Sequence, residues 1–101
     1  MIVVTGGAGF IGSNLVAALE AAGQRDLVVC DWLGRDEKWR NIAKRDLADL
    51  IAPEELFDFL DARRGTIETI FHMGAISATT ETDADLIART NIELPQRLWH
   101  W

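Results

Sequence analysis

A glycine-rich stretch, TGGAGFIG, occupies residues 5–12. Gly7, Gly9 and Gly12 give the spacing G-x-G-x-x-G, whereas Gly6, Gly9 and Gly12 give G-x-x-G-x-x-G. Either spacing frees backbone N–H groups and removes Cβ atoms at the start of a helix, as a bound phosphate requires. Helix–strand packing alone would explain Gly12, but it would not explain the clustering of Gly6, Gly7 and Gly9. The stretch therefore predicts the phosphate loop of a dinucleotide site, and both spacings stay open.

An acidic residue follows this loop at the distance that such a site requires, about 20 residues. Asp31 ends the apolar run LVVC of residues 27–30, and its carboxylate there can accept the two ribose hydroxyls of an adenosine. This favours NAD, because a 2′-phosphate would be repelled unless cations neutralise it. Arg35, Lys38 and Arg40 could supply that charge, or could form a solvated surface run with the acids between them.

Two further features could contact the adenine. Trp32 and Trp39 could stack on it, although covering the sheet edge is the simpler interpretation. If residues 42–46 form a short third strand, Asp46 could accept a hydrogen bond from the adenine amino group and Leu47 could pack on the ring.

The segment FHMGAIS, residues 71–77, follows a further apolar run at residues 67–71. Ligands of open α/β sheets bind at such strand ends, where the strand order reverses. Gly74 and Ala75 would let a cofactor lie against the backbone. His72 could exchange protons, but the sequence offers it no evident partner, so a structural role is the better interpretation.

The elements that would position these residues alternate between strands and helices. The expected strands cover residues 1–5, 27–30, 42–46 and 67–71, and the expected helices residues 11–22, 53–64 and 83–90. The first helix carries an apolar stripe of Ile11, Leu15, Ala18, Leu19 and Ala22. This alternation predicts an α/β fold with a doubly wound parallel sheet and the strand order 3-2-1-4.

The bulk properties exclude several classes of partner. A chain of 101 residues with a formal charge of −6 is one domain at most, and it lacks the basic surface that nucleic acids and anionic membranes attract. No apolar stretch approaches the length of a membrane span. The one cysteine, Cys30, lies in an apolar run and cannot form an internal disulfide. The cytoplasm is the expected location, and no metal site is expected.

The motifs VTGGAGFIGSNLV, VVCD, DLAD, FHMGAISATTETD and TNIELPQRL together resemble the N-terminal part of the extended short-chain dehydrogenase/reductase family. Within it, HMGAISATTETD is the more specific motif and favours the nucleotide-sugar epimerases that act on an ADP-linked heptose. The resemblance favours the G-x-x-G-x-x-G reading and implies an NAD(P)-binding Rossmann-like domain. It also implies an enzyme that inverts a sugar carbon with NADP, NAD being accepted too.

The resemblance further implies a set of cofactor-binding residues along the chain. They are Gly6, Gly9, Phe10, Ile11 and Gly12 for the pyrophosphate, Asp31 and Trp32 for the ribose, Lys38 for the 2′-phosphate, Met73, Gly74, Ala75, Ile76 and Ser77 along the cofactor, and Asn91 at the nicotinamide. Two positions depart from the family. Trp32 replaces a usual polar residue such as Asn, and Pro53 stands where some relatives carry a lysine near the 2′-phosphate.

The family's catalytic pair is a tyrosine and a lysine four residues later, and this sequence contains no tyrosine. We therefore expect residues 1–101 to be the N-terminal part of a Rossmann domain, truncated after about four strands and inert alone. The parent protein would carry the nucleotide-sugar site and would form a homo-oligomer. The alternatives are another nucleotide-sugar epimerase or dehydratase, or a non-catalytic NAD(P)-binding module.

Overall fold

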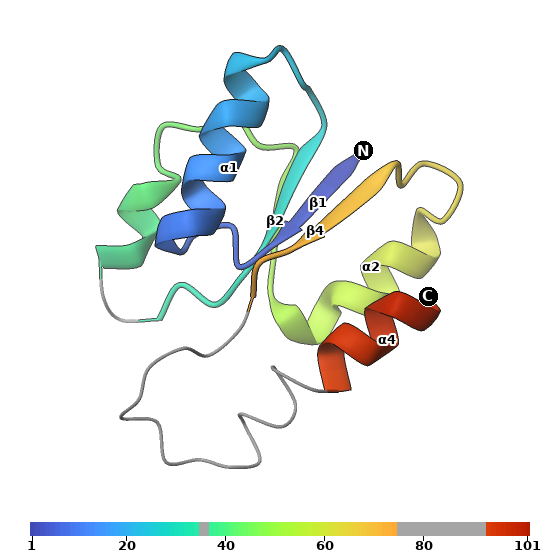
Figure 1. Ribbon diagram of the computed structural model, residues 1–101. Helices are drawn as coiled ribbons and strands as arrows, with labels where there is room; N and C mark the ends of the chain where they lie inside the picture. Colours follow the sequence, from blue (N-terminus) through green and yellow to red (C-terminus); the bar gives the residue numbers. More distant parts are fainter. Residues whose placement is uncertain (35–36, 75–92) are drawn as a thin grey trace.

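The computed structural model describes residues 1–34, 37–74 and 93–101 (Figure 1). In this part of the chain, β1 (Ile2–Thr5), β2 (Leu27–Cys30), β3 (Asp49–Ile51) and β4 (Thr69–His72) form one sheet. All neighbouring strands are parallel, and their order is β3-β2-β1-β4. The predicted α/β class and the predicted order 3-2-1-4 are confirmed.

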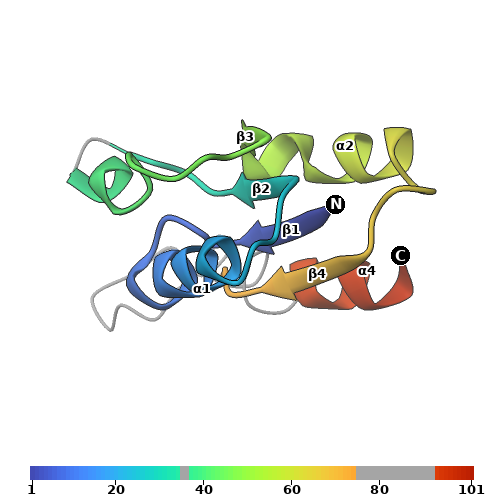
Figure 2. The ribbon, with the colours of Figure 1, turned by 90° about the horizontal axis from the view of Figure 1, so that it is seen from above.

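Helices cover both faces of the sheet. Helix α1 (Phe10–Ala21) lies on one face, whereas α2 (Leu56–Ala62) and α4 (Leu94–His100) lie on the other (Figures 1 and 2). The strands supply both cores because successive side chains point to opposite faces. Val4 and Val29 therefore pack with Val16 of α1, and Val3 and Val28 pack in the core beneath α2.

Helix α1 begins after Gly9 and ends before Gly23, whose φ is +87°. The face it buries differs from the expected stripe: Gly12 and Val16 are buried, while Ile11 is 66% exposed. Ala18 and Ala22 are also exposed, whereas Leu15 and Leu19 pack against the core as expected. The helix is rotated from the predicted stripe because Gly12, which has no side chain, lies directly on the glycine loop.

The expected third strand at residues 42–46 is wrong. A 3₁₀ helix, η1 (Glu37–Asn41), ends where that strand was to start, and the strand that pairs with β2 is Asp49–Ile51. Ile42 is buried as a single side chain in the core beneath α1. An isolated apolar residue that packs in this way imitates the start of a strand in the sequence.

The second helical segment is close to its expected position. A 3₁₀ turn, η2 (Pro53–Glu55), leads into α2. The apolar stripe of Leu56, Phe59 and Leu60 is buried as the sequence predicted. Among the residues that the structure describes, no helix is long and apolar enough to cross a membrane.

Candidate functional site

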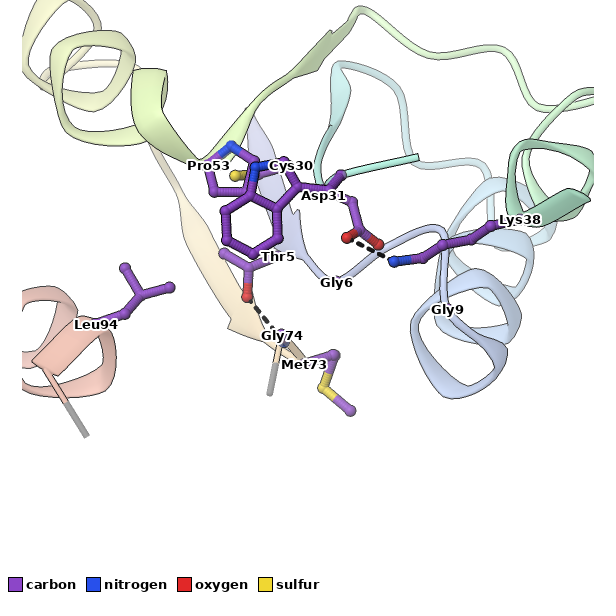
Figure 3. Close-up of a pocket in the computed structure, with 11 residues that line it drawn as sticks. Thr5, Gly6, Gly9, Cys30, Asp31, Lys38, Pro53, Met73, Gly74 and Leu94 are labelled. Carbon is purple, nitrogen blue, oxygen red and sulfur yellow. Dashed lines mark hydrogen bonds and ion pairs between the residues drawn. The ribbon is translucent and has the colours of Figure 1, made fainter. Parts of the chain in front are cut away.

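A cavity of about 200 Å³ opens at the carboxyl ends of β1, β2 and β4 (Figure 3). Gly6, Asp31 and Met73 come directly after these three strands, and all three line it. In Figure 3 the Asp31 carboxylate points toward Lys38 on one side, while Pro53 and Leu94 lie on the other. The cavity therefore has a charged side and an apolar side, at the strand ends where ligands of parallel sheets bind.

Close packing with the neighbouring strand requires Gly6 to be glycine. Its φ is +67°, and a Cβ atom there would approach the backbone of Gly74 to 2.7 Å. Its N–H donates to the carbonyl of Cys30 at 2.8 Å. Gly6 thus joins the ends of β2 and β4, a role that glycine spacing alone does not reveal.

Packing also explains two more of the glycines. A Cβ atom on Gly12 would contact the Gly6 carbonyl oxygen, and one on Gly7 would approach Val29 Cγ2 to 2.8 Å. Gly9 differs, because the nearest atom to an added Cβ is 3.4 Å away. The expectation that packing would explain Gly12 alone is therefore wrong.

Gly9 caps the N-terminus of α1 without a side-chain hydrogen bond, and the first turn of the helix holds no acidic residue. Phe10 and Ile11 of that turn are 81% and 66% exposed. The first N–H groups of a helix have no partners within the helix, and they carry its positive dipole end. This end of α1 can therefore bind an anion such as a pyrophosphate.

Both oxygens of the Asp31 carboxylate already have partners. Oδ1 accepts from Lys38 Nζ at 2.8 Å, and Oδ2 accepts from the Ala8 N–H at 3.1 Å. The structure thus brings Lys38 to Asp31 at the end of β2. Arg40 pairs instead with Glu37 at 3.3 Å, and Arg35 lies outside the described residues.

Sequence reasoning missed Asn41. Its Nδ2 donates to the Ala8 carbonyl at 2.7 Å, so η1 is bonded to the glycine loop. An asparagine directly before an apolar residue gives no signal of this role in the sequence.

Trp32 lines the cavity, and its exposed fraction is 42%. Its Nε1 donates to Glu54 Oε1 at 2.7 Å. Trp39 is 48% exposed and lies beneath the guanidinium of Arg40, 5.6 Å from the ring centre. The two tryptophans therefore have different surroundings, and only Trp32 reaches the described cavity wall.

The end of β4 is held to β1 by a network around Thr5. The Met73 N–H donates to the Thr5 carbonyl at 3.0 Å, and the Gly74 N–H donates to Thr5 Oγ1 at 3.2 Å. Thr5 Oγ1 also lies 2.6 Å from His72 Nδ1. Burial lowers the pKa of His72, which favours the neutral imidazole, and the tautomer of that ring decides which of the two atoms donates in this contact.

Asp46 and Leu47 do not lie at this site. They precede β3 rather than following the third strand, so they lie near the amino ends of the parallel strands, whereas the cavity opens at the carboxyl ends. The Asp46 N–H donates to Glu20 Oε2 at 2.9 Å, and Leu47 packs against the core beneath α1. Their assignment to the adenine depended on the misplaced strand. Ala75, Ile76, Ser77 and Asn91 lie outside the described residues.

Cys30 borders the cavity as an unreactive thiol. Burial raises its pKa to about 12, and the carboxylates of Asp31, Glu54 and Glu55 add to the rise. Within residues 1–34, 37–74 and 93–101, no three His, Cys, Asp or Glu side chains gather to hold a metal ion.

The model of one protein family matches residues 2–101 of this chain, and its description is "NAD dependent epimerase/dehydratase family". The chain belongs to this family. The match covers the glycine loop, the Asp31–Lys38 pair and the end of β4 together.

Two curated proteins match the sequence of this chain over its whole length. A protein of Alkalilimnicola ehrlichii is 46% identical over 103 residues, and one of Fusobacterium nucleatum is 44% identical over 103 residues. Both are named ADP-L-glycero-D-manno-heptose-6-epimerase. The chain spans 32% and 31% of their lengths, about a third of each.

Solved structures support the same family. UDP-glucuronic acid 4-epimerase from Bacillus cereus in complex with NAD superposes with a TM-score of 0.76 at 29% identity. The match covers 96% of this chain and 33% of that one. A second structure of that enzyme, with UDP-glucuronic acid and NAD, gives a TM-score of 0.71 at 29% identity. A Rossmann-like α/β fold of the NAD-dependent epimerases is thus established for this chain.

Proposed function

We propose that this chain is the cofactor-binding part of a nucleotide-sugar epimerase that converts ADP-D-glycero-D-manno-heptose to ADP-L-glycero-D-manno-heptose. The observation that supports the substrate is the 46% and 44% identity, over the whole chain, to two relatives with that activity in their names. The product would serve lipopolysaccharide core synthesis in the cytoplasm.

The cofactor in this proposal is NADP, with NAD also accepted. The open end of α1 at Gly9 would hold the pyrophosphate, together with Gly6, Phe10, Ile11 and Gly12. Asp31 would accept the ribose hydroxyls, beside Trp32, and Lys38 would neutralise a 2′-phosphate. Met73 and Gly74 would lie along the cofactor, as would Ala75, Ile76, Ser77 and Asn91. When bound, NADP supplies the hydride acceptor and donor that such an epimerisation needs.

The acid–base chemistry would come from elsewhere in the parent protein. The family's Tyr-x-x-x-Lys pair is not met within these 101 residues, which include no tyrosine. We expect the 101-residue chain to bind dinucleotide but not to turn over ADP-heptose. Proton NMR of the sugar after incubation tests this, and inversion of the heptose carbon by the 101 residues alone would refute it. The parent would be a homo-oligomer.

The structural neighbours favour a second candidate substrate. Because they are UDP-glucuronic acid 4-epimerases with TM-scores of 0.76 and 0.71, another nucleotide-sugar is the alternative. A panel of ADP- and UDP-sugars offered to the parent protein separates the two candidates. Turnover of a UDP-sugar in preference to the ADP-heptose would favour the alternative.

Lys38→Ala tests the assignment of NADP. The substitution should weaken NADPH binding about ten- to hundredfold while NADH binding changes less, since one charge-assisted hydrogen bond to phosphate is worth about 1.5–3 kcal/mol. Isothermal titration calorimetry with both cofactors measures this. Lys44→Ala is the matched control, because Lys44 is exposed and its substitution removes the same charge. An unchanged ratio of the two affinities in Lys38→Ala would remove Lys38 from the 2′-phosphate site.

A further inference from the structure

An indole forms one wall of the cavity beside Asp31. Trp32 is the next residue along the chain, lines the cavity and remains 42% exposed. Its hydrogen bond of 2.7 Å to Glu54 joins the segment after β2 to the segment after β3. Pro53, beside Glu54, lines the same cavity. The hydrogen bond restrains the ring before any ligand arrives, which reduces the entropy that binding would otherwise lose.

The charge at this end of the cavity is unbalanced. Lys38 pairs with Asp31 at 2.8 Å, and no lysine or arginine of the described segments pairs with Glu54. Asp31, Glu54 and Glu55 all act on the Cys30 thiol at the cavity edge. Among the residues that the structure describes near the end of β2, the carboxylates of Asp31, Glu54 and Glu55 outnumber the single cation, Lys38.

We propose that Trp32 and Glu54 form a specificity-determining pair for the adenosine half of the dinucleotide. The indole packs on the adenosine, whose ribose lies at the neighbouring Asp31. Glu54 holds the indole in place, and its carboxylate weakens the binding of a 2′-phosphate relative to a free 2′-hydroxyl. This inference rests on the proposed dinucleotide site.

The charge effect can be separated from the hydrogen bond. Glu54→Gln keeps an oxygen that accepts from the indole N–H but removes the negative charge. We expect NADPH affinity to rise about fivefold relative to NADH at low salt, with NADH affinity unchanged. Glu68→Gln is the matched control, because it makes the same change of net charge on an exposed residue before β4, at the opposite edge of the sheet. An unchanged ratio in Glu54→Gln, or an equal rise in Glu68→Gln, overturns the proposal.

The packing role of the indole is tested with a fragment of the cofactor. Trp32→Ala should weaken both NADH and ADP-ribose about tenfold in calorimetric titrations, because both contain the adenosine. Trp39→Ala, which removes an exposed tryptophan outside the cavity wall, should change neither. If Trp32→Ala leaves ADP-ribose binding unchanged, the pair does not contact adenosine. If the unmodified protein binds neither NADH nor NADPH, the proposed function fails and this inference fails with it.

Discussion

Thr5 is a single buried hydroxyl that connects the ends of two strands at the site, β1 and β4. It is 2% exposed, accepts from the Gly74 N–H and contacts His72 Nδ1 at 2.6 Å. A buried polar group is costly without partners, so both contacts stabilise the fold as well as the shape of the cavity. His72 therefore has the structural role that the sequence favoured, with a partner 67 residues away.

The lowered pKa of His72 gives stability a pH dependence. Burial depresses this pKa below the ordinary value of 6.5, so the unfolded chain binds the proton more readily than the folded chain. The stabilising contribution should be fully present above about pH 6.5 and should be lost as the pH falls through the lower folded value. Urea unfolding at several pH values measures it. His72→Gln should flatten the slope below pH 6.5, and an identical slope in both proteins would contradict the assignment.

The glycine loop and α1 form one packed element. Three of the four loop glycines are required by backbone or side-chain atoms that approach from β4, β2 and the loop itself. The helix can therefore start close to the sheet, which leaves its N-terminus facing the cavity. The close approach of the helix to the sheet therefore explains both why these positions need glycine and why the N-terminus of α1 could bind an anion at the cavity.

Gly12→Ala tests this close approach. The added methyl group would contact the Gly6 carbonyl group, so the helix must shift, and we expect a loss of about 1–3 kcal/mol in the free energy of unfolding. Gly65→Ala is the matched control, because nothing lies within 4 Å of its added methyl group. Denaturant titrations followed by circular dichroism compare the two variants. Equal stability of Gly12→Ala and the unmodified chain would refute the tight packing.

At the level of the whole molecule, β4 lies at the edge of the described sheet and pairs with β1 alone. Its residues are half-buried, and Trp99 of α4 is 87% exposed. An unpaired strand edge is a template for pairing with another chain. We therefore expect the separate 101-residue chain to associate with itself through these surfaces.

We expect the 101-residue chain to sediment as concentration-dependent oligomers at concentrations above tens of micromolar, on the order of those at which exposed edges aggregate. Sedimentation velocity at several concentrations tests this. Thr69→Lys at the start of β4 should reduce association, and circular dichroism checks that the variant folds. A sharp, reversible melt from a monomer at high concentration would contradict the expectation.

The sequence by itself determined the alternation of strands and helices over residues 1–74 and the position of the glycine loop, because these depend on local periodicity and glycine spacing, and the usual topology of a doubly wound sheet supplied the strand order. It misplaced β3 and with it Asp46 and Leu47, because a lone buried Ile42 has the local pattern of a strand. Only the tertiary structure showed that Gly6 meets Gly74, that Thr5 meets His72 and that Trp32 is bonded to Glu54. Each of these contacts joins residues from different strand ends, and no local pattern records which ends a parallel sheet brings together.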